Sequence, residues 1–216
     1  MTAARANAGI RRAPMQRRSR ERVQQILDAA SELIVEDGVT ALSTRTIAER
    51  AGVPVASLYQ YFADKDEILL ALVERDTAEM DAAVATAVGT LGTVSVRTLV
   101  TATMRAFVRI YHQRPAFVVI WWRGRSNQVV YDFCRAHNKR IAADLFAFAE
   151  ASGMVRAGTV SRVVELAVEV GDRVFQLAFE HDLRGDEGII AEGIELVTGY
   201  LERHATAAGA AGISPA

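Results

Sequence analysis

Hydrophobic residues recur at intervals of three and four along most of this chain, the spacing that places them on one face of an α-helix. In residues 19–37 this apolar face is followed by Gly38, a residue type that commonly ends helices. Similar spacing predicts further helices, over residues 97–113, 115–123, 126–151, 160–181 and 186–204. No stretch alternates hydrophobic and polar residues in the way that a pair of strands requires. The pattern therefore predicts an all-α protein.

A second pattern, TRTIAERAGVPVASLYQYF, occupies residues 44–62 and predicts two short helices joined by a tight turn. Ser43 or Thr44 is suited to begin the first helix, because a hydroxyl oxygen can accept hydrogen bonds from free backbone N–H groups. Gly52 suits the turn, and Pro54 suits the start of the second helix. The residues expected to face inward are Ile47, Ala48, Val53 and Leu58. Two helices joined in this way form a helix-turn-helix, whose second helix lies in the major groove of DNA.

The outward side chains of this segment have the chemistry of DNA contacts. Hydroxyl and amide groups can hydrogen-bond base edges, small apolar groups can touch a thymine methyl, and tyrosine hydroxyls and cations can reach phosphates. The candidate residues, in that order, are Ser57, Gln60, Val55, Ala56, Tyr59, Tyr61, Arg45 and Lys65. Helical hairpins without a DNA-binding role share the general pattern, so it does not by itself establish DNA binding.

The order of a helix ending in Gly38, then LSTRTIAERAGVPVASLYQYF, then ADKDEILLAL resembles the N-terminal domain of the tetracycline-repressor (TetR) family of transcriptional regulators. The resemblance covers residues 18–72, about a quarter of the chain. It implies a three-helix DNA-binding domain followed by a larger helical domain that binds a ligand and dimerises. It also implies contacts to operator DNA from Thr44, Arg45, Ser57, Tyr59, Tyr61 and Lys65, with Val55, Ala56 and Gln60 on the helix that selects the sequence.

Positive charge is concentrated at the beginning of the chain. Residues 1–22 contain seven arginines and one acidic residue, a net charge of +6, while the rest carries 18 basic and 25 acidic residues, a net charge of −7. We expect residues 1–17 to form a disordered basic arm. The arginines between Arg11 and Arg20, among them Arg17 and Arg18, are expected to follow phosphates or enter the minor groove. The alternative is a solvated leader. The segment lacks the apolar run of a secretory signal.

The expected domain boundaries follow from these segments. The DNA-binding domain is expected over residues 18–64, the ligand-binding and dimerisation domain over 65–204, and a flexible tail over 205–216. Asp64 and Glu67 resemble a capping box at the start of the helix that joins the two domains. That helix can therefore carry a signal between them.

The helix expected over residues 160–181 is apolar around most of its circumference, so it must be buried on two sides. The second side is covered either by its own chain or by a second subunit. The TetR resemblance implies a homodimer through the last two helices, which suits a palindromic operator. The last-helix residues assigned to this interface are Ile189, Ile190, Ile194, Val197, Tyr200 and Leu201, and the small residues expected to permit close approach are Ala167, Gly171, Gly193 and Gly199.

Bulky side chains are concentrated between the DNA-binding segment and the last two helices. For any one of them packed core is the simpler interpretation, but the TetR resemblance implies a pocket among these helices. Ligand pockets are mostly apolar with a few polar groups that set orientation. We therefore expect a small apolar or aromatic effector. The candidate lining residues are Thr103, Met104, Phe107, Tyr111, Phe117, Trp121, Trp122, Phe133, His137 and Phe175.

Catalytic chemistry is weakly represented. Cys134 and His137 lie three residues apart, but the chain has no glycine-rich phosphate loop, nucleophile elbow or HExxH motif. We expect no enzyme activity, no cofactor and no metal, with a metal-assisted ligand site at His137 or His181 as the alternative. No stretch approaches the ~20 apolar residues of a membrane span, and the single cysteine fits a reducing compartment, so a soluble cytoplasmic protein is expected.

These features predict a ligand-responsive transcriptional regulator: a repressor that binds double-stranded operator DNA as a homodimer and is released by its effector. One alternative is an activator or a nucleoid-type DNA binder without an effector. The other is a helical protein-interaction module without DNA binding.

Overall fold

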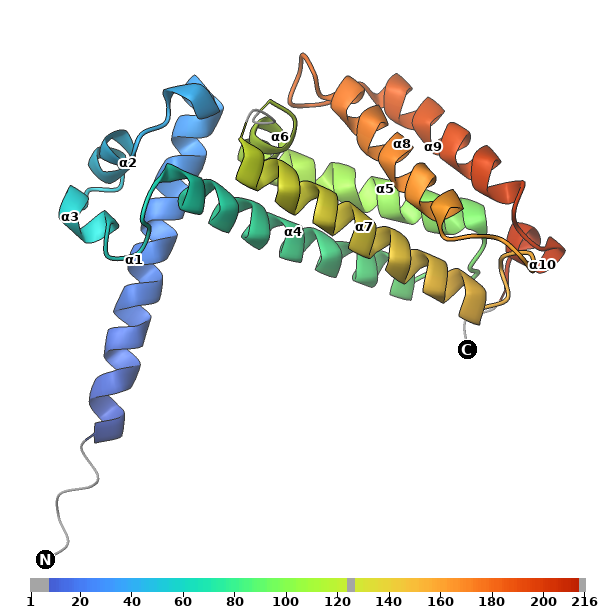
Figure 1. Ribbon diagram of the computed structural model, residues 1–216, viewed down its shortest axis with the longest axis horizontal. Coiled ribbons are helices and arrows are strands. Elements are labelled where there is room, and N and C mark those ends of the chain that lie inside the picture. Colours follow the sequence, from blue (N-terminus) through green and yellow to red (C-terminus); the bar gives the residue numbers. More distant parts are fainter. Residues whose placement is uncertain (1–7, 124–126, 214–216) are drawn as a thin grey trace, which may run out of the picture. The chain divides into compact units, whose positions relative to one another are not determined.

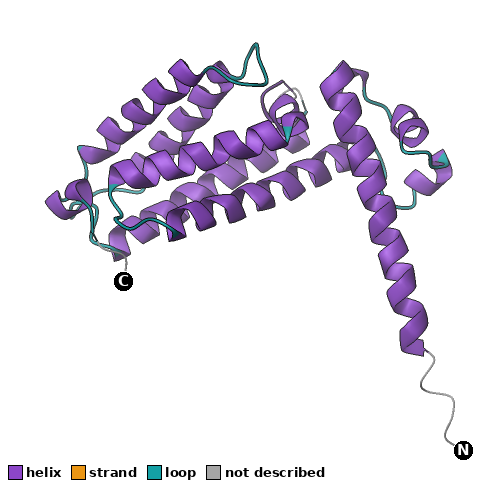
Figure 2. Ribbon diagram, turned by 180° about the vertical axis from the view of Figure 1, so that it is seen from behind, coloured by secondary structure: helices purple, strands orange, loops and turns teal. Residues whose placement is uncertain are grey.

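The computed structural model describes residues 8–123 and 127–213, with side chains described for 17–122 and 127–213. Every regular element in this part of the chain is a helix, and Figure 2 shows no strand there. The elements are α1 (Ala8–Asp37), η1 (Val39–Ala41), α2 (Thr44–Arg50), α3 (Val55–Leu58), α4 (Lys65–Gly89), α5 (Val96–Gln113), α6 (Pro115–Val118), η2 (Val119–Arg123), α7 (Gln128–Ala151), α8 (Arg162–Ala178), α9 (Glu187–Glu202) and α10 (Ala207–Ala211) (Figure 1). The all-α prediction is confirmed for the described residues.

The chain divides into two compact units, Met1–Leu72 and Val73–Ala216. The division falls inside α4, later than the predicted boundary after residue 64. The first two turns of α4 explain the difference, because their apolar residues are fully buried and belong to the N-terminal unit. These residues are Ile68, Leu69 and Leu72. One helix therefore supplies core to the first unit and continues into the second.

The core of the N-terminal unit is formed by the apolar faces that the sequence pattern predicts. Its fully buried side chains include Ile26, Ala30 and Ile34 from α1, Ile47 and Ala48 from α2, and Leu58 from α3. Arg50 of α2 is bound to α1 by ion pairs with Glu36 at 2.6 Å and Glu32 at 3.2 Å. These ion pairs are partly exposed and add little stability, so burial of the apolar faces holds α1 and α2 together.

The start of α1 differs from the prediction. Residues 8–17 were expected to be a disordered arm, but α1 already begins at Ala8. Three arginines and two alanines among these ten residues are strong helix formers, and they favour a helix despite Gly9 and Pro14, which are unfavourable in one. Charge alone therefore did not distinguish a disordered arm from a solvated helix, and residues 1–7 lie outside the described part.

In the C-terminal unit α8 and α9 lie side by side, and α5 and α7 pack against this pair (Figure 1). Gly193 of α9 permits the close approach, because a Cβ atom at this position would overlap the side chain of Val174 on α8. Arg97 of α5 also pairs with Glu195 of α9 at 2.5 Å. The four helices form a bundle whose interior is available for a cavity.

Several residues expected at a dimer interface are buried inside this bundle instead. The last-helix residues among them were assigned to a second subunit, which was wrong, because periodicity shows that a helix face is apolar but not what covers it. The small residues were predicted only to permit close approach of helices. Gly193, for example, serves the contact between α8 and α9 of one chain. The buried residues of that prediction are Ile190, Ile194, Val197, Ala167, Gly171 and Gly193.

The end of the chain is also more ordered than predicted. Residues 205–213, expected to be part of a flexible tail, include α10 and two antiparallel backbone bridges. One bridge joins Val155 to Ala205 and the other joins Val94 to Ile213. These pairings are long-range backbone contacts between short segments with no strand periodicity. The last three residues of the chain lie outside the described part.

Candidate nucleic-acid interface and ligand cavity

Local sequence explains the geometry of the α2–α3 pair. Ser43 caps α2 through a reciprocal capping box, in which its hydroxyl accepts from Thr46 N and Thr46 Oγ1 accepts from Ser43 N, each at 3.1 Å. Gly52 adopts φ 64°, a left-handed conformation that glycine reaches without strain. Pro54 then begins α3 as its N-cap residue. The predicted helix-turn-helix is present, with α3 itself only one turn long.

The nine residues of this segment that were predicted to contact DNA are all accessible to solvent. The side chain of Arg45 is 82% exposed and Tyr59 is 54% exposed. The predicted inward residues are buried. The exposed residues are Arg45, Val55, Ala56, Tyr59 and Gln60, and the half-buried ones are Thr44, Ser57, Tyr61 and Lys65. The surface therefore offers hydroxyl, amide and cationic groups around the exposed side of α3.

Two contacts order this surface. The hydroxyl groups of Thr44 and Tyr59 lie 3.1 Å apart, which connects the start of α2 to the end of α3. Arg45 donates from Nε to Glu49 Oε1 at 3.0 Å on the same exposed side. An exposed ion pair of this kind is weak, so a phosphate can replace Glu49 as the partner of Arg45 at little cost.

Positive charge continues along α1. Arg17 is 76% exposed in its side chain and lies 3.4 Å from Glu21, one turn along the helix. Arg18 is exposed as well. Both guanidinium groups are carried by a helix, which sets their spacing. The disordered arm that was expected to end at Arg17 is therefore not what carries them. Cations of this kind contribute salt-dependent affinity for phosphates.

The start of α4 carries the predicted cap. Asp64 accepts from the backbone N–H groups of Asp66 at 2.9 Å and Glu67 at 3.0 Å. Glu67 reaches back to accept from Ala63 N at 2.6 Å. Lys65 is the first residue of the helix that follows. These bonds fix the position of Lys65 relative to the end of α3 within the N-terminal unit.

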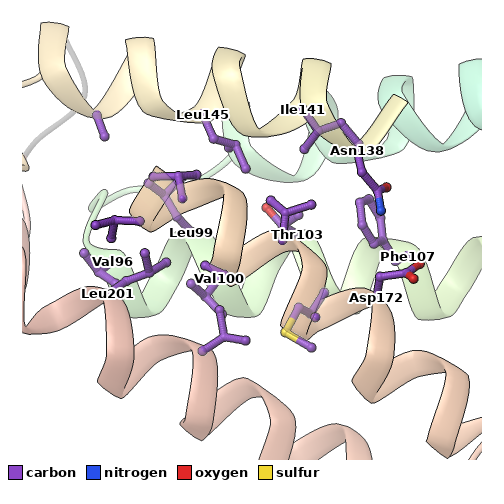
Figure 3. Close-up of a pocket in the computed structure, with 18 of the residues that line it drawn as sticks. Val96, Leu99, Val100, Thr103, Phe107, Asn138, Ile141, Leu145, Asp172 and Leu201 are labelled. Atoms are coloured by element: carbon purple, nitrogen blue, oxygen red, sulfur yellow. The ribbon is translucent and has the colours of Figure 1, made fainter. Parts of the chain in front are cut away.

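A cavity of about 140 Å³ lies within the C-terminal unit (Figure 3). A water molecule needs about 10–15 Å³ of such space, so the cavity holds a molecule of at least roughly ten non-hydrogen atoms. Residues from α4, α5, η2, α7, α8, α9 and the loop between α7 and α8 line it. Most of these residues are apolar, as in other ligand pockets.

Seven of the ten residues predicted to line a pocket do so. They are Thr103, Met104, Phe107, Tyr111, Trp121, His137 and Phe175. The other three lie behind the wall. Phe117 is fully buried and stacks on Tyr111, with ring centroids 5.9 Å apart, Trp122 stacks on Phe179 at 5.7 Å, and Phe133 stacks on His137 at 6.1 Å. Their assignment to the lining was wrong, because composition identifies an aromatic cluster but not which rings face its empty space.

One end of the cavity is polar. Asp172 Oδ1 accepts from Trp121 Nε1 at 2.7 Å, and Figure 3 shows the side chains of Asp172 and Asn138 on the same side of the cavity. Trp121 lies in the π-helical turn η2, where a continuous helix had been predicted. Burial raises the pKa of Tyr111 well above its usual value, and the charge of Asp172 raises it further. The Tyr111 hydroxyl therefore stays protonated and can donate to a ligand.

His137 is the buried histidine of this wall. Its Nδ1 lies 2.7 Å from an Nη of Arg140, which can only donate, and its Nε2 lies 3.5 Å from Asp81 Oδ1. Burial lowers the pKa of His137, an effect opposed by Asp81 and reinforced by Arg140. We infer a neutral ring whose Nδ1 accepts a hydrogen bond from Arg140 and whose proton lies on Nε2, a buried atom that makes no hydrogen bond within the described structure. This arrangement fits a structural role better than metal binding.

Sequence reasoning missed the aliphatic part of the lining and its single carboxylate. Asp172 is one of several acidic residues in the helix expected over residues 160–181, and no sequence signal distinguishes it from the others. The aliphatic residues are spaced like ordinary core. The missed residues include Met80, Val96, Leu99, Val100, Ile141, Leu145, Met154, Val163, Val164 and Leu201.

Two features are absent from the described residues. No group of three or more histidine, cysteine, aspartate or glutamate side chains is placed to hold a metal ion. No helix in the part of the chain that the structure covers is long and apolar enough to cross a membrane.

Comparisons with known proteins agree with this division. Residues 26–72 match the family model of bacterial regulatory proteins of the tetR family, and residues 95–205 match the model of the tetracyclin repressor-like C-terminal domain. A solved structure of a TetR-family transcriptional regulator from Streptomyces coelicolor is similar to 85% of this chain and 99% of its own, with 31% identity and a TM-score of 0.68.

Curated relatives match through the N-terminal unit. The HTH-type transcriptional repressor KstR of Mycolicibacterium smegmatis is 40% identical over 63 residues, which are 29% of this chain and 31% of KstR. The HTH-type transcriptional activator FasR of the same organism is 47% identical over 55 residues, 26% of this chain and 25% of FasR. The matched parts thus span less than a third of either regulator, and one of the two represses whereas the other activates.

Proposed function

Since this chain belongs to the tetR family of bacterial regulatory proteins, we propose that it binds a palindromic operator as a homodimer and is released from it by a small, largely apolar effector. The observation that carries the DNA-binding part is the division of the α2–α3 segment. Its apolar side chains are buried, whereas all nine side chains with DNA-contact chemistry are accessible. A short exposed helix of this kind is suited to the major groove.

The dimer is supported by the outer surfaces of α8 and α9. Leu166 and Leu177 of α8 are 50% and 41% exposed, and their separation by three helical turns places them on one face. Leu196 on the adjacent helix α9 is 58% exposed. Exposed leucines on two neighbouring helices favour a contact with a second copy. A two-fold dimer of this kind presents two α3 helices to a palindrome.

Release by an effector follows from the continuity of α4. Met80 of this helix lines the cavity, and Leu69 of the same helix lies in the core of the N-terminal unit. A ligand that fits the cavity with Met80 in only one position therefore also favours one conformation of the N-terminal unit. By linkage, an effector that weakens operator binding by a given factor is itself bound more weakly by the same factor in the presence of operator.

The first experiment measures binding of the purified protein to the DNA that flanks its own gene, by mobility shift, footprinting and a salt series. We expect a protected palindrome of about one to three helical turns, with half-sites spaced by whole turns. Arg45→Ala and Tyr59→Ala are expected to lose this protection, while Tyr131→Ala on α7 retains it. If no site appears there and selection from random DNA enriches none, the proposal is wrong and a helical interaction protein takes its place.

The sign of regulation needs a separate measurement, because the matched relatives include an activator as well as a repressor. We propose repression, in which the bound dimer blocks a promoter. Transcript levels of the flanking genes should rise when the gene is deleted. A fall on deletion, with the same footprint, would instead identify an activator.

A further inference from the structure

The loop between α7 and α8 forms one end of the cavity. Met154, Val155 and Thr159 of this loop belong to its lining. Figure 3 shows Val96 and Leu201 together at the end of the cavity away from its polar side chains. Val96 begins α5, directly after the bridge between Val94 and Ile213. Leu201 lies in the last turn of α9, shortly before the bridge between Ala205 and Val155 of the loop. The loop therefore closes the apolar end.

Residues 205–213 hold this loop from outside the cavity, and we call them the strap. Thr206 N donates to Met154 O at 2.8 Å, and the Thr206 hydroxyl donates to Gly153 O at 2.9 Å. No residue of the strap belongs to the described lining of the cavity. The strap thus contacts the backbone of the loop whose side chains form the wall.

Further bonds come from the loop and from the far end of the strap. Arg156 donates from its backbone N to His204 O at 2.9 Å and from Nε to Ala205 O at 2.8 Å. Val94 and Ile213 exchange two backbone hydrogen bonds, at 2.8 and 2.9 Å, which anchor the strap just before α5. Both ends of the strap are therefore attached to segments that adjoin the cavity.

The middle of the strap is packed without space to spare. Gly209 of α10 is buried, and a Cβ atom at this position would overlap the carbonyl of Met154. Met154 itself is only 1% exposed. Protein interiors transmit such overlaps instead of absorbing them. A single added methyl at position 209 must consequently move α10, the loop or both.

We propose that the strap determines the length of ligand that the cavity accepts, because it holds the α7–α8 loop in place as the end wall. The proposal rests on the ligand-binding role proposed above for this cavity. A ligand with its polar group near Asp172 extends its apolar part toward Met154. With the strap in place, the end wall excludes a ligand whose apolar part is longer. With the strap released, the loop can move outward and admit it.

The test uses the full-length protein and a series of linear primary alcohols, from hexanol to tetradecanol, which displace the uncharged fluorophore N-phenyl-1-naphthylamine. In the wild type, the affinity for the alcohol should rise about fourfold per added methylene until its alkyl chain meets the end wall. The alcohol length at which the affinity stops rising is the break. In Gly209→Ala this break should move by at least one methylene, to longer alcohols if α10 yields to the added methyl and to shorter ones if the loop yields. The matched control is Gly89→Ala, because a Cβ at Gly89 meets nothing within 4 Å.

A second variant, Arg156→Ala with Thr206→Val, releases the strap by removing hydrogen bonds and adds no bulk. This variant carries the test if Gly209→Ala loses cooperative unfolding. It should shift the break to longer alcohols, because the loop loses side-chain hydrogen bonds that hold it in place. Its control is Arg203→Ala, since Arg203 is exposed and no bond from it to the loop is found in the described structure.

A break at the wild-type length in folded variants of both kinds overturns the strap proposal and leaves the ligand cavity intact. No displacement by any alcohol, even in the wild type, overturns the ligand role of the cavity and the strap proposal with it. The mobility shift with operator DNA is measured separately, so that loss of DNA binding is not confused with either result.

Discussion

In the N-terminal unit the candidate functional side chains lie on the outside of a small core, whereas in the C-terminal unit they line a cavity inside the bundle. The candidate DNA-contact residues come mostly from residues 44–65, and the cavity is lined by residues between 80 and 204. A surface that reads DNA can be built by a short segment because DNA supplies the other half of the site. A cavity must be enclosed on all sides, so it needs helices that are distant in the sequence.

The largest expected effect separates the two units. Leu58 is fully buried in the N-terminal unit, so Leu58→Ala should cost about 2–5 kcal/mol of that unit's stability. Operator binding should be lost while displacement of the fluorophore from the cavity is unchanged. Thermal unfolding followed by circular dichroism, together with both binding assays, checks this. Val35→Ala, at a 41% exposed position on α1 of the same unit, is the matched control for stability. Parallel loss of cavity binding would show that the units do not fold independently.

The next effect concerns the outside of the C-terminal unit. Leu166→Asp with Leu177→Asp places two charges on the exposed face of α8 and should weaken dimerisation by at least about 2 kcal/mol, roughly thirtyfold. Sedimentation against protein concentration measures this, and operator affinity should fall with it. Val129→Asp on α7, at a 43% exposed position, should leave the dimer intact. An unchanged dimer in the double variant would place the interface elsewhere.

Filling the cavity should separate ligand response from DNA binding. Gly171 of α8 lines the cavity, and a Cβ at this position meets nothing within 4 Å. Gly171→Leu should stabilise the helix by about 0.5–1 kcal/mol and lower fluorophore affinity by at least tenfold. Operator affinity should be kept. Gly199→Ala, which adds its methyl on the exposed side of α9, tests the helix effect alone. Full fluorophore binding by Gly171→Leu would contradict the cavity assignment.

A smaller effect is expected from the hydroxyl pair of the DNA surface. Tyr59→Phe removes the 3.1 Å contact with Thr44 and a potential phosphate donor. One hydrogen bond of this kind contributes about 1 kcal/mol, or roughly fivefold in operator affinity. Because Tyr59 is exposed, the melting temperature should stay the same. Tyr131→Phe on α7 serves as control. A loss of stability without loss of affinity would make the contact purely structural.

The smallest effect is the pH dependence from His137. Burial lowers the pKa of this histidine in the folded state, so the unfolded chain binds the proton more readily. Its contribution to stability is therefore complete above the unfolded pKa of about 6.5 and declines as the pH falls toward the folded value. Asp81 and Arg140 are the charged groups that face it. His137→Phe should flatten this part of the stability curve, measured by urea unfolding between pH 5 and pH 8. An equal slope in wild type and variant would contradict this.

Much of the fold could be predicted from the sequence because helices are local. The apolar spacing of Ile26, Ile47 and Leu58 identified the N-terminal core, and Ser43, Gly52 and Pro54 identified the turns between its helices. Seven of the cavity residues were also found, because bulky groups collect where a bundle has room. Which aromatic ring faces the cavity could not be predicted, as the buried Phe117 shows, since that depends on helix rotation set by neighbours far along the chain.

By itself the sequence determined the helical class, the helix-turn-helix and the set of side chains on its outer surface, because each depends on residues within a few turns of one another. Only the tertiary structure decided how α8 and α9 use Gly193, how Asp172 meets Trp121, and how residues 205–213 bond to the α7–α8 loop. Periodicity records that a face is buried, but not what buries it. The covering partner is selected by packing and by backbone hydrogen bonds between distant segments, which leave no repeating pattern in the sequence.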